Sequence, residues 1–112
     1  MKAAIVITWT GVRTGRESLS VAFAREVDVH WGKLAAEGKC AEPKWFWAMN
    51  GPSYWIVEGD FEALLMLSST PEAQKLLLKG PFICENFGQE ICVAGREEML
   101  KPTEELISEM KL

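Results

Sequence analysis

Histidine, cysteine and long apolar runs are all scarce in this chain of 112 residues. The single histidine and the three cysteines, none of them in a CxxC spacing, argue against a zinc site or a disulfide framework and favour a reducing compartment. No apolar run approaches the ~18 residues of a membrane-spanning helix. Lysine and arginine number 12 against 16 aspartate and glutamate residues and form no long block, so the charge pattern typical of nucleic-acid binding is missing.

The N-terminal segment MKAAIVITWTGVR is apolar but lacks the features of a secretory signal peptide. It carries one lysine before a short apolar run, and that run ends in Trp9 and Thr10 without a small-residue cleavage site. We interpret the segment as a β-strand, and we expect a cytoplasmic protein that contacts no membrane.

Tryptophan, by contrast, is abundant, and three of its five copies lie in the segment Lys44–Asp60. Two aromatic-rich runs in this segment flank Asn50-Gly51-Pro52-Ser53, a set of residues that favours a turn. The pattern predicts a β-hairpin.

Neither face of the expected hairpin is polar. If Asn50 lies opposite Ser53, alternation of the side chains gives one wholly apolar face and one face that also carries a hydroxyl and a carboxylate. We expect helices of the same chain to cover the apolar face and a second subunit to cover the other, and a shift of one residue in the register would exchange them. The apolar face comprises Phe46, Ala48, Trp55 and Val57, and the other comprises Trp45, Trp47, Met49, Tyr54, Ile56 and Glu58.

The segments before the hairpin have strand and helix patterns in turn. Ala3–Thr10 is a short, β-branched apolar run, which predicts a strand buried on both faces. Residues 17–37 carry apolar side chains at helical spacing, and Gly38 follows where a helix would end.

After the hairpin, Asp60 and Thr70 are placed to cap two consecutive helices. The charged tail that closes the chain includes a further amphipathic piece. The predicted elements are helices at Phe61–Ser68 and 70–79, a last strand at Gln89–Ala94, and a short helix from Pro102 within the tail of residues 96–112.

This βαββαβ order predicts one α+β domain over residues 1–95. Its four strands would form an antiparallel sheet with both helices on one face, because right-handed crossovers place the helices on the same side. The bare face would expose more apolar surface than a monomer normally tolerates, so we expect a homodimer.

The element order, the segment YWIVEGDFEALLMLSSTPEAQKLLLKGPF and the closing QEICVAG resemble the dimeric α/β-barrel superfamily of ferredoxin-like proteins. Its members include small antibiotic-biosynthesis monooxygenases, haem-degrading monooxygenases and muconolactone isomerase. The resemblance covers residues 3–95 and implies a barrel built between two subunits, with a ligand pocket between sheet and helices in each.

On this chain the implied pocket would be lined by Phe23, His30, Trp31, Phe46 and Trp55. The haem-degrading members use an asparagine, a tryptophan and a histidine together. Here Asn50 lies in a turn and the sole histidine lies on the first helix rather than the second, so the chain departs from that pattern. We therefore expect no haem or other cofactor, and no metal.

His30 is the first candidate for acid–base chemistry, because its side chain titrates near neutral pH. The alternative is a packed histidine paired with Glu26, one helical turn earlier. The tryptophans likewise fit either a site for a flat ligand or a core and interface. A weaker candidate is an anion site formed by Arg13 and Arg16 before the first helix.

The sequence thus predicts a small homodimer that binds a small apolar or aromatic ligand between sheet and helices. Two alternatives stay open at this point. One is a cofactor-independent monooxygenase or isomerase with His30 as acid or base, and the other is a protein-interaction module that acts through its tail, Thr103–Leu112.

Overall fold

A four-stranded antiparallel sheet forms the framework of the computed structural model, which describes residues 1–111. The strand order is β3-β4-β1-β6, so the first strand lies in the centre, as expected for a βαββαβ chain. Two further strands of two residues each, β2 (Gly11–Val12) and β5 (Cys84–Glu85), pair with each other beside the sheet. The strands of the main sheet are β1 (Lys2–Trp9), β3 (Lys44–Phe46), β4 (Ser53–Asp60) and β6 (Gly88–Val93).

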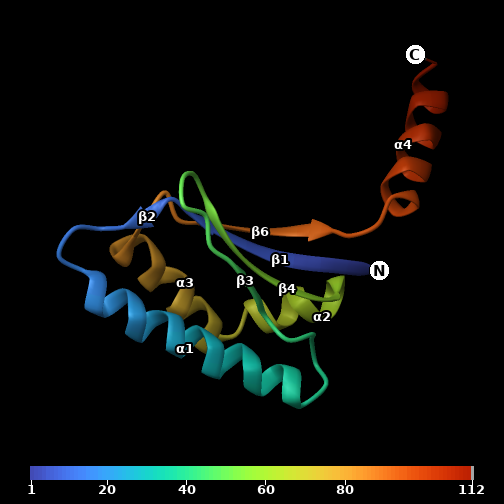
Figure 1. Cartoon of the computed structure of the whole chain (residues 1–112). Coiled ribbons are helices and arrows are strands. Elements are labelled where there is room, and N and C mark those ends of the chain that lie inside the picture. The colour runs from blue at the N-terminus through green and yellow to red at the C-terminus, as the bar shows by residue number, and fades with distance from the viewer. Residues whose placement is uncertain (112) are drawn as a thin grey trace.

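Three helices cover one face of this sheet, as Figure 1 shows. They are α1 (Glu17–Ala36), α2 (Phe61–Ser68) and α3 (Pro71–Ile83). The core lies between them and the sheet, since alternate residues of β1 are buried and the apolar side of α1 buries Phe23, Val27 and Trp31. Ile5 of β1 lies opposite Val57 of β4, and both are fully buried.

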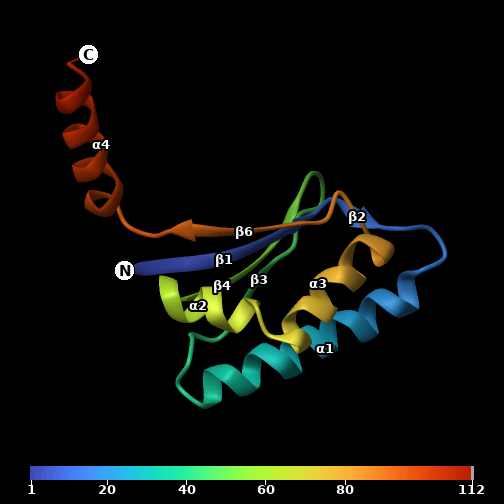
Figure 2. The same cartoon turned by 180° about the vertical axis from the view of Figure 1, so that it is seen from behind.

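The predicted break between α2 and α3 is confirmed. The Asp60 carboxylate accepts a hydrogen bond from the Ala63 amide (3.2 Å), and the Thr70 hydroxyl accepts one from the Ala73 amide (3.3 Å). Each side chain therefore satisfies one amide that the first turn of a helix leaves without a partner. Figure 2 shows the two helices in succession from the other side.

The predicted end of α3 at residue 79 is wrong, because the helix continues through Pro81 to Ile83. Arg13 supports this last turn, since its Nε donates to the Pro81 carbonyl (2.8 Å) and its amide to the Ile83 carbonyl (2.9 Å). Arg16 donates to the Phe82 carbonyl. Both guanidinium groups are thus engaged with helix carbonyls rather than arranged as an anion site.

The predicted register of the hairpin is wrong. Trp45 lies opposite Trp55, and Phe46 lies opposite Tyr54 instead of Val57. The reason is a longer loop, because β3 ends at Phe46 and residues 47–52 connect it to β4. This odd shift exchanges the faces of β3 but not of β4, so Trp45 faces the helices and Phe46 lies on the opposite, open face.

The tail forms α4 (Glu97–Met110), which starts before the predicted position at Pro102. No residue of α4 is buried, and Figures 1 and 2 show it standing away from the sheet, on the side opposite the other three helices. Leu112, which the predicted tail segment includes, lies outside the described residues. Within residues 1–111 no helix is both long and apolar enough to cross a bilayer.

Candidate functional site

A cavity of about 540 Å³ lies between α1 and the sheet, next to the short strands β2 and β5. Four of the five tryptophans line it, namely Trp9, Trp45, Trp47 and Trp55. The helix α1 contributes Phe23 and four other apolar or small residues, and Phe87 and Cys84 close one end. Its volume is within the range of small-molecule sites in proteins, which is about 300–1,000 Å³.

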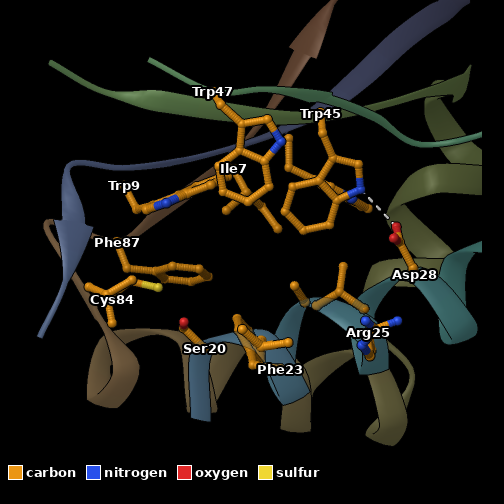
Figure 3. Close-up of a pocket in the computed structure, with 15 residues that line it drawn as sticks. Ile7, Trp9, Ser20, Phe23, Arg25, Asp28, Trp45, Trp47, Cys84 and Phe87 are labelled. Atoms are coloured by element: carbon orange, nitrogen blue, oxygen red, sulfur yellow. Dashed lines mark hydrogen bonds between the residues drawn. The ribbon is translucent and has the colours of Figure 1, made fainter. Parts of the chain in front are cut away.

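The tryptophans form an ordered wall, shown in Figure 3. Trp45 and Trp47 stack with ring centroids 5.2 Å apart and an angle of 6° between their planes. Trp9 stands nearly perpendicular to both, at 6.0 Å from Trp45 and 5.6 Å from Trp47. Trp45 and Trp47 are two positions apart on an extended segment, so their side chains project to the same side. Both reach Trp9 of β1.

The cavity runs from a buried interior to an open mouth. Trp55 and Trp9 are 1% and 8% exposed, whereas Trp47 is 68% exposed. A flat apolar ligand could therefore enter beside Trp47 and bury its rings against the inner indoles. Burial of this kind is favourable at roughly 25 cal/mol per Å² of apolar surface.

The polar groups of the cavity are few, and most come from α1. Asp28 is held at one edge of the cavity, because one carboxylate oxygen accepts a hydrogen bond from the Trp45 indole N–H at 2.8 Å. Ser20 and Arg25 lie earlier on the same helix. Figure 3 shows Asp28 directed to Trp45, with Arg25 below it.

Cys84 is the one thiol in the cavity wall. Burial raises the pKa of its thiol above the ordinary value, and the nearby positive charge of Arg13 opposes this shift only in part. A thiol with a raised pKa is mostly protonated at neutral pH, so Cys84 is a packing residue of the wall rather than an activated nucleophile.

The structure brings together part of the predicted lining. Phe23 and Trp55 line the cavity, as the resemblance implied. Trp31 is 4% exposed and packs edge-on against Trp55 at 5.6 Å, deeper in the core and outside this lining. Phe46 lies on the open face of the sheet and is 51% exposed, because the register of β3 differs from the prediction.

The predicted lining left out Trp9, Trp45 and Trp47, which the sequence had left open between a flat-ligand site and a core or interface. The aromatic content of the hairpin was a visible signal, but the assignment of faces depended on the register. The register also placed Trp45 close enough to bond Asp28, a contact between residues 17 positions apart that no local pattern indicates.

His30 lies outside the cavity lining. Its ring meets Trp31 edge-on, with centroids 5.3 Å apart, and its Nε2 is buried without a hydrogen-bond partner among residues 1–111. The expected contact with Glu26 is absent there, because Glu26 pairs with Lys79 of α3 (2.8 Å). This environment matches a packed histidine more closely than a general acid or base.

In the described part of the chain, no three histidine, cysteine, aspartate or glutamate side chains gather as metal ligands would. The remaining carboxylates singled out in the sequence have structural partners. Asp60 caps α2, and Glu58 lies 3.4 Å from the Lys44 ammonium nitrogen across the hairpin.

No protein-family model matches the chain, and no curated protein matches it. Several solved structures do match. A protein from Mycobacterium tuberculosis superimposes with a TM-score of 0.65 at 13% sequence identity, over 87% of this chain and 98% of that chain.

A candidate antibiotic biosynthesis monooxygenase from Caulobacter crescentus gives a TM-score of 0.60 at 15% identity, covering 85% of this chain and 91% of that chain. A dimeric protein with a ferredoxin-like fold from Bacteroides fragilis gives 0.53 at 13% identity, covering 82% and 96%. The chain therefore has the ferredoxin-like α+β fold, as its sequence resemblance implied.

Proposed function

We propose that this protein is a homodimer that binds a small, flat apolar or aromatic molecule in the tryptophan-lined cavity. The observation that carries the proposal is the wall of Trp9, Trp45, Trp47 and Trp55, which combines a large apolar area with an open mouth. Aromatic side chains favour aromatic ligands through stacked and edge-to-face contacts, in addition to the burial of apolar area.

A pair of substitutions on α1 tests this binding. Val21 lines the cavity and is 56% exposed, whereas Val29 is 73% exposed on the same helix and lies outside the lining. Val21→Phe should fill part of the cavity and weaken the binding of 2-naphthylmethanol, measured by isothermal titration calorimetry. Val29→Phe is the matched control and should bind normally, and equal affinity in both variants would contradict the proposed site.

The open face of the sheet supports the homodimer. Val6 and Thr8 of β1 and Ile56 of β4 lie there half-buried, beside the exposed Phe46 and Tyr54. None of the three helices α1–α3 covers this face. Two such faces stacked together would bury the apolar strip, and the Bacteroides fragilis protein of similar fold is itself a dimer.

Size-exclusion chromatography with light scattering at micromolar concentration tests the assembly. Val6→Glu would place a carboxylate in the centre of the stacked sheets and should give a monomer. Leu78→Glu on α3, at a position 68% exposed on the other side of the sheet, is the matched control. A wild-type monomer at that concentration would refute the homodimer.

A second proposed role is protein–protein interaction through α4, whose apolar side chains are exposed. Because α4 stands on the open-face side of the sheet, its natural contact in a stacked dimer is the second subunit. Deletion of residues 96–112 should then weaken dimerisation. If the dimer is unchanged, α4 does not contact the second subunit, and the proposal becomes that it binds a different protein. The exposed apolar residues are Met99, Leu100, Leu106, Ile107 and Met110.

A further inference from the structure

We infer that the cavity selects planar aromatic amines in their protonated form, with the rings against the tryptophans and the ammonium group at Asp28. This inference rests on the proposed function and names the chemical class of its ligand. It starts from the one carboxylate that lines a mainly apolar and aromatic cavity.

Asp28 is oriented toward the aromatic wall and still has acceptor capacity. Its Oδ1 accepts from the Trp45 indole at 2.8 Å, which fixes the carboxylate beside the ring. A carboxylate has about four lone-pair sites, so the contact with Trp45 leaves acceptor sites for a ligand. The ion pairs found within residues 1–111 do not include Asp28.

The tryptophans of the cavity that Asp28 borders are suited to a cation. Trp45, whose indole binds Asp28, stacks in parallel with Trp47, and Trp9 is perpendicular to both, so aromatic walls of two orientations line the cavity that Asp28 borders. Tryptophan is the best aromatic partner for an ammonium group within about 6 Å of its ring. A carboxylate among tryptophans is the combination that recognises an aromatic ring bearing a positive charge.

Neutral and anionic ligands are expected to bind next to Asp28 less tightly than a cation. A neutral aromatic molecule that covers Asp28 would remove water from the carboxylate without replacing it, which costs free energy. An anionic ligand would be repelled by Asp28 and by the net charge of −4. Arg25 also lines the cavity and could hold an anion, so an anionic analogue belongs in the test.

The test compares three naphthalene derivatives that differ in charge, titrated by calorimetry into the full-length protein at neutral pH. They are 2-naphthylmethylamine as the cation, 2-naphthylmethanol as the neutral form and 2-naphthoate as the anion. We expect the cation to bind about fivefold to tenfold more tightly than the alcohol, and the anion to bind most weakly. Equal affinity of amine and alcohol, or tightest binding of the naphthoate, would overturn the inference while leaving the aromatic site in place. If none of the three binds, the proposed function itself fails.

Two variants locate the charge preference. D28N removes the charge and keeps an amide oxygen that can accept from the Trp45 indole, so the ratio of amine to alcohol affinity should fall to about one. E26Q removes a carboxylate from the same helix outside the cavity lining and should keep the wild-type ratio. If the D28N ratio equals that of the wild type, Asp28 is excluded as the source of the charge preference. The salt dependence of the wild-type protein is a second test that does not need a stable D28N variant: a ratio that does not fall in high salt would contradict a charge interaction.

Discussion

Gly80 of α3 lies directly against the ring of Phe87, so that a Cβ at position 80 would overlap that ring. Phe87 in turn meets Phe23 edge-on at 6.4 Å, and both rings line the cavity. The missing side chain of Gly80 is therefore what allows Phe87 to occupy its place between α3 and the cavity.

Gly80→Ala should destabilise the protein by about 1–3 kcal/mol, because the added methyl group must displace Phe87. Gly32→Ala is the matched control, since a Cβ at that helical position has no heavy atom within 4 Å. It should be neutral or stabilise by up to ~1 kcal/mol, because alanine favours the helix. Urea unfolding measures both, and equal stability of the two variants would contradict the close contact at Gly80.

Thr70→Ala should lower the free energy of unfolding by about 1 kcal/mol, because the Ala73 amide loses its acceptor at the start of α3. Thr70→Ser keeps the hydroxyl and should retain most of the stability. Thermal unfolding followed by circular dichroism distinguishes the two variants. A serine variant as unstable as the alanine variant would mean that the methyl group, and not the cap, is responsible.

Alkylation of Cys84 should be slow at neutral pH and accelerate as the pH rises. The thiolate is the reactive form, and burial raises the pKa of this thiol, so a higher pH is needed to populate it than in an unfolded chain. Iodoacetamide labelling followed by peptide mass spectrometry gives the rate at each pH. The same peptide labelled in urea provides the control, and an identical pH profile in the folded and unfolded protein would contradict the raised pKa.

His30→Ala should change stability but not ligand affinity. The side chain packs against Trp31 and lies outside the cavity lining, so its loss should reduce stability by roughly 1–3 kcal/mol. Titration of 2-naphthylmethanol into this variant should give the wild-type affinity within about twofold, since no contact of the ligand is removed. A large loss of binding without unfolding would return His30 to the site and favour the enzyme alternative.

Local patterns in the sequence predicted most of the elements correctly. The helical spacing of apolar residues in 17–37 predicted α1, which buries Phe23, Val27 and Trp31, and Thr70 placed the start of α3. These features depend on residues within one or two turns of one another, so periodicity and capping are sufficient to recognise them. The same holds for β4, whose alternation correctly directed Trp55 and Val57 toward the helices.

The failures in α3, the hairpin and the partner of Glu26 involve contacts between residues far apart in the chain. Helix α3 passes the predicted stop at Gly80-Pro81 because Arg13, 68 positions earlier, donates to the Pro81 carbonyl. Glu26 was expected beside His30, but it pairs with Lys79 on a neighbouring helix. Propensity describes the local chain and carries no information on such partners.

The sequence by itself determined the order of the elements and an aromatic hairpin with two apolar faces. Only the tertiary structure decided which tryptophans line the cavity, because the pairing of Trp45 with Trp55 is a property of two strands and not of either one. Side chains alternate with a period of two, so an odd shift in register moves every residue of β3 to the other face. That shift placed Trp45 beside Asp28 and Phe46 on the open face. The register therefore decided which side chains form the proposed site.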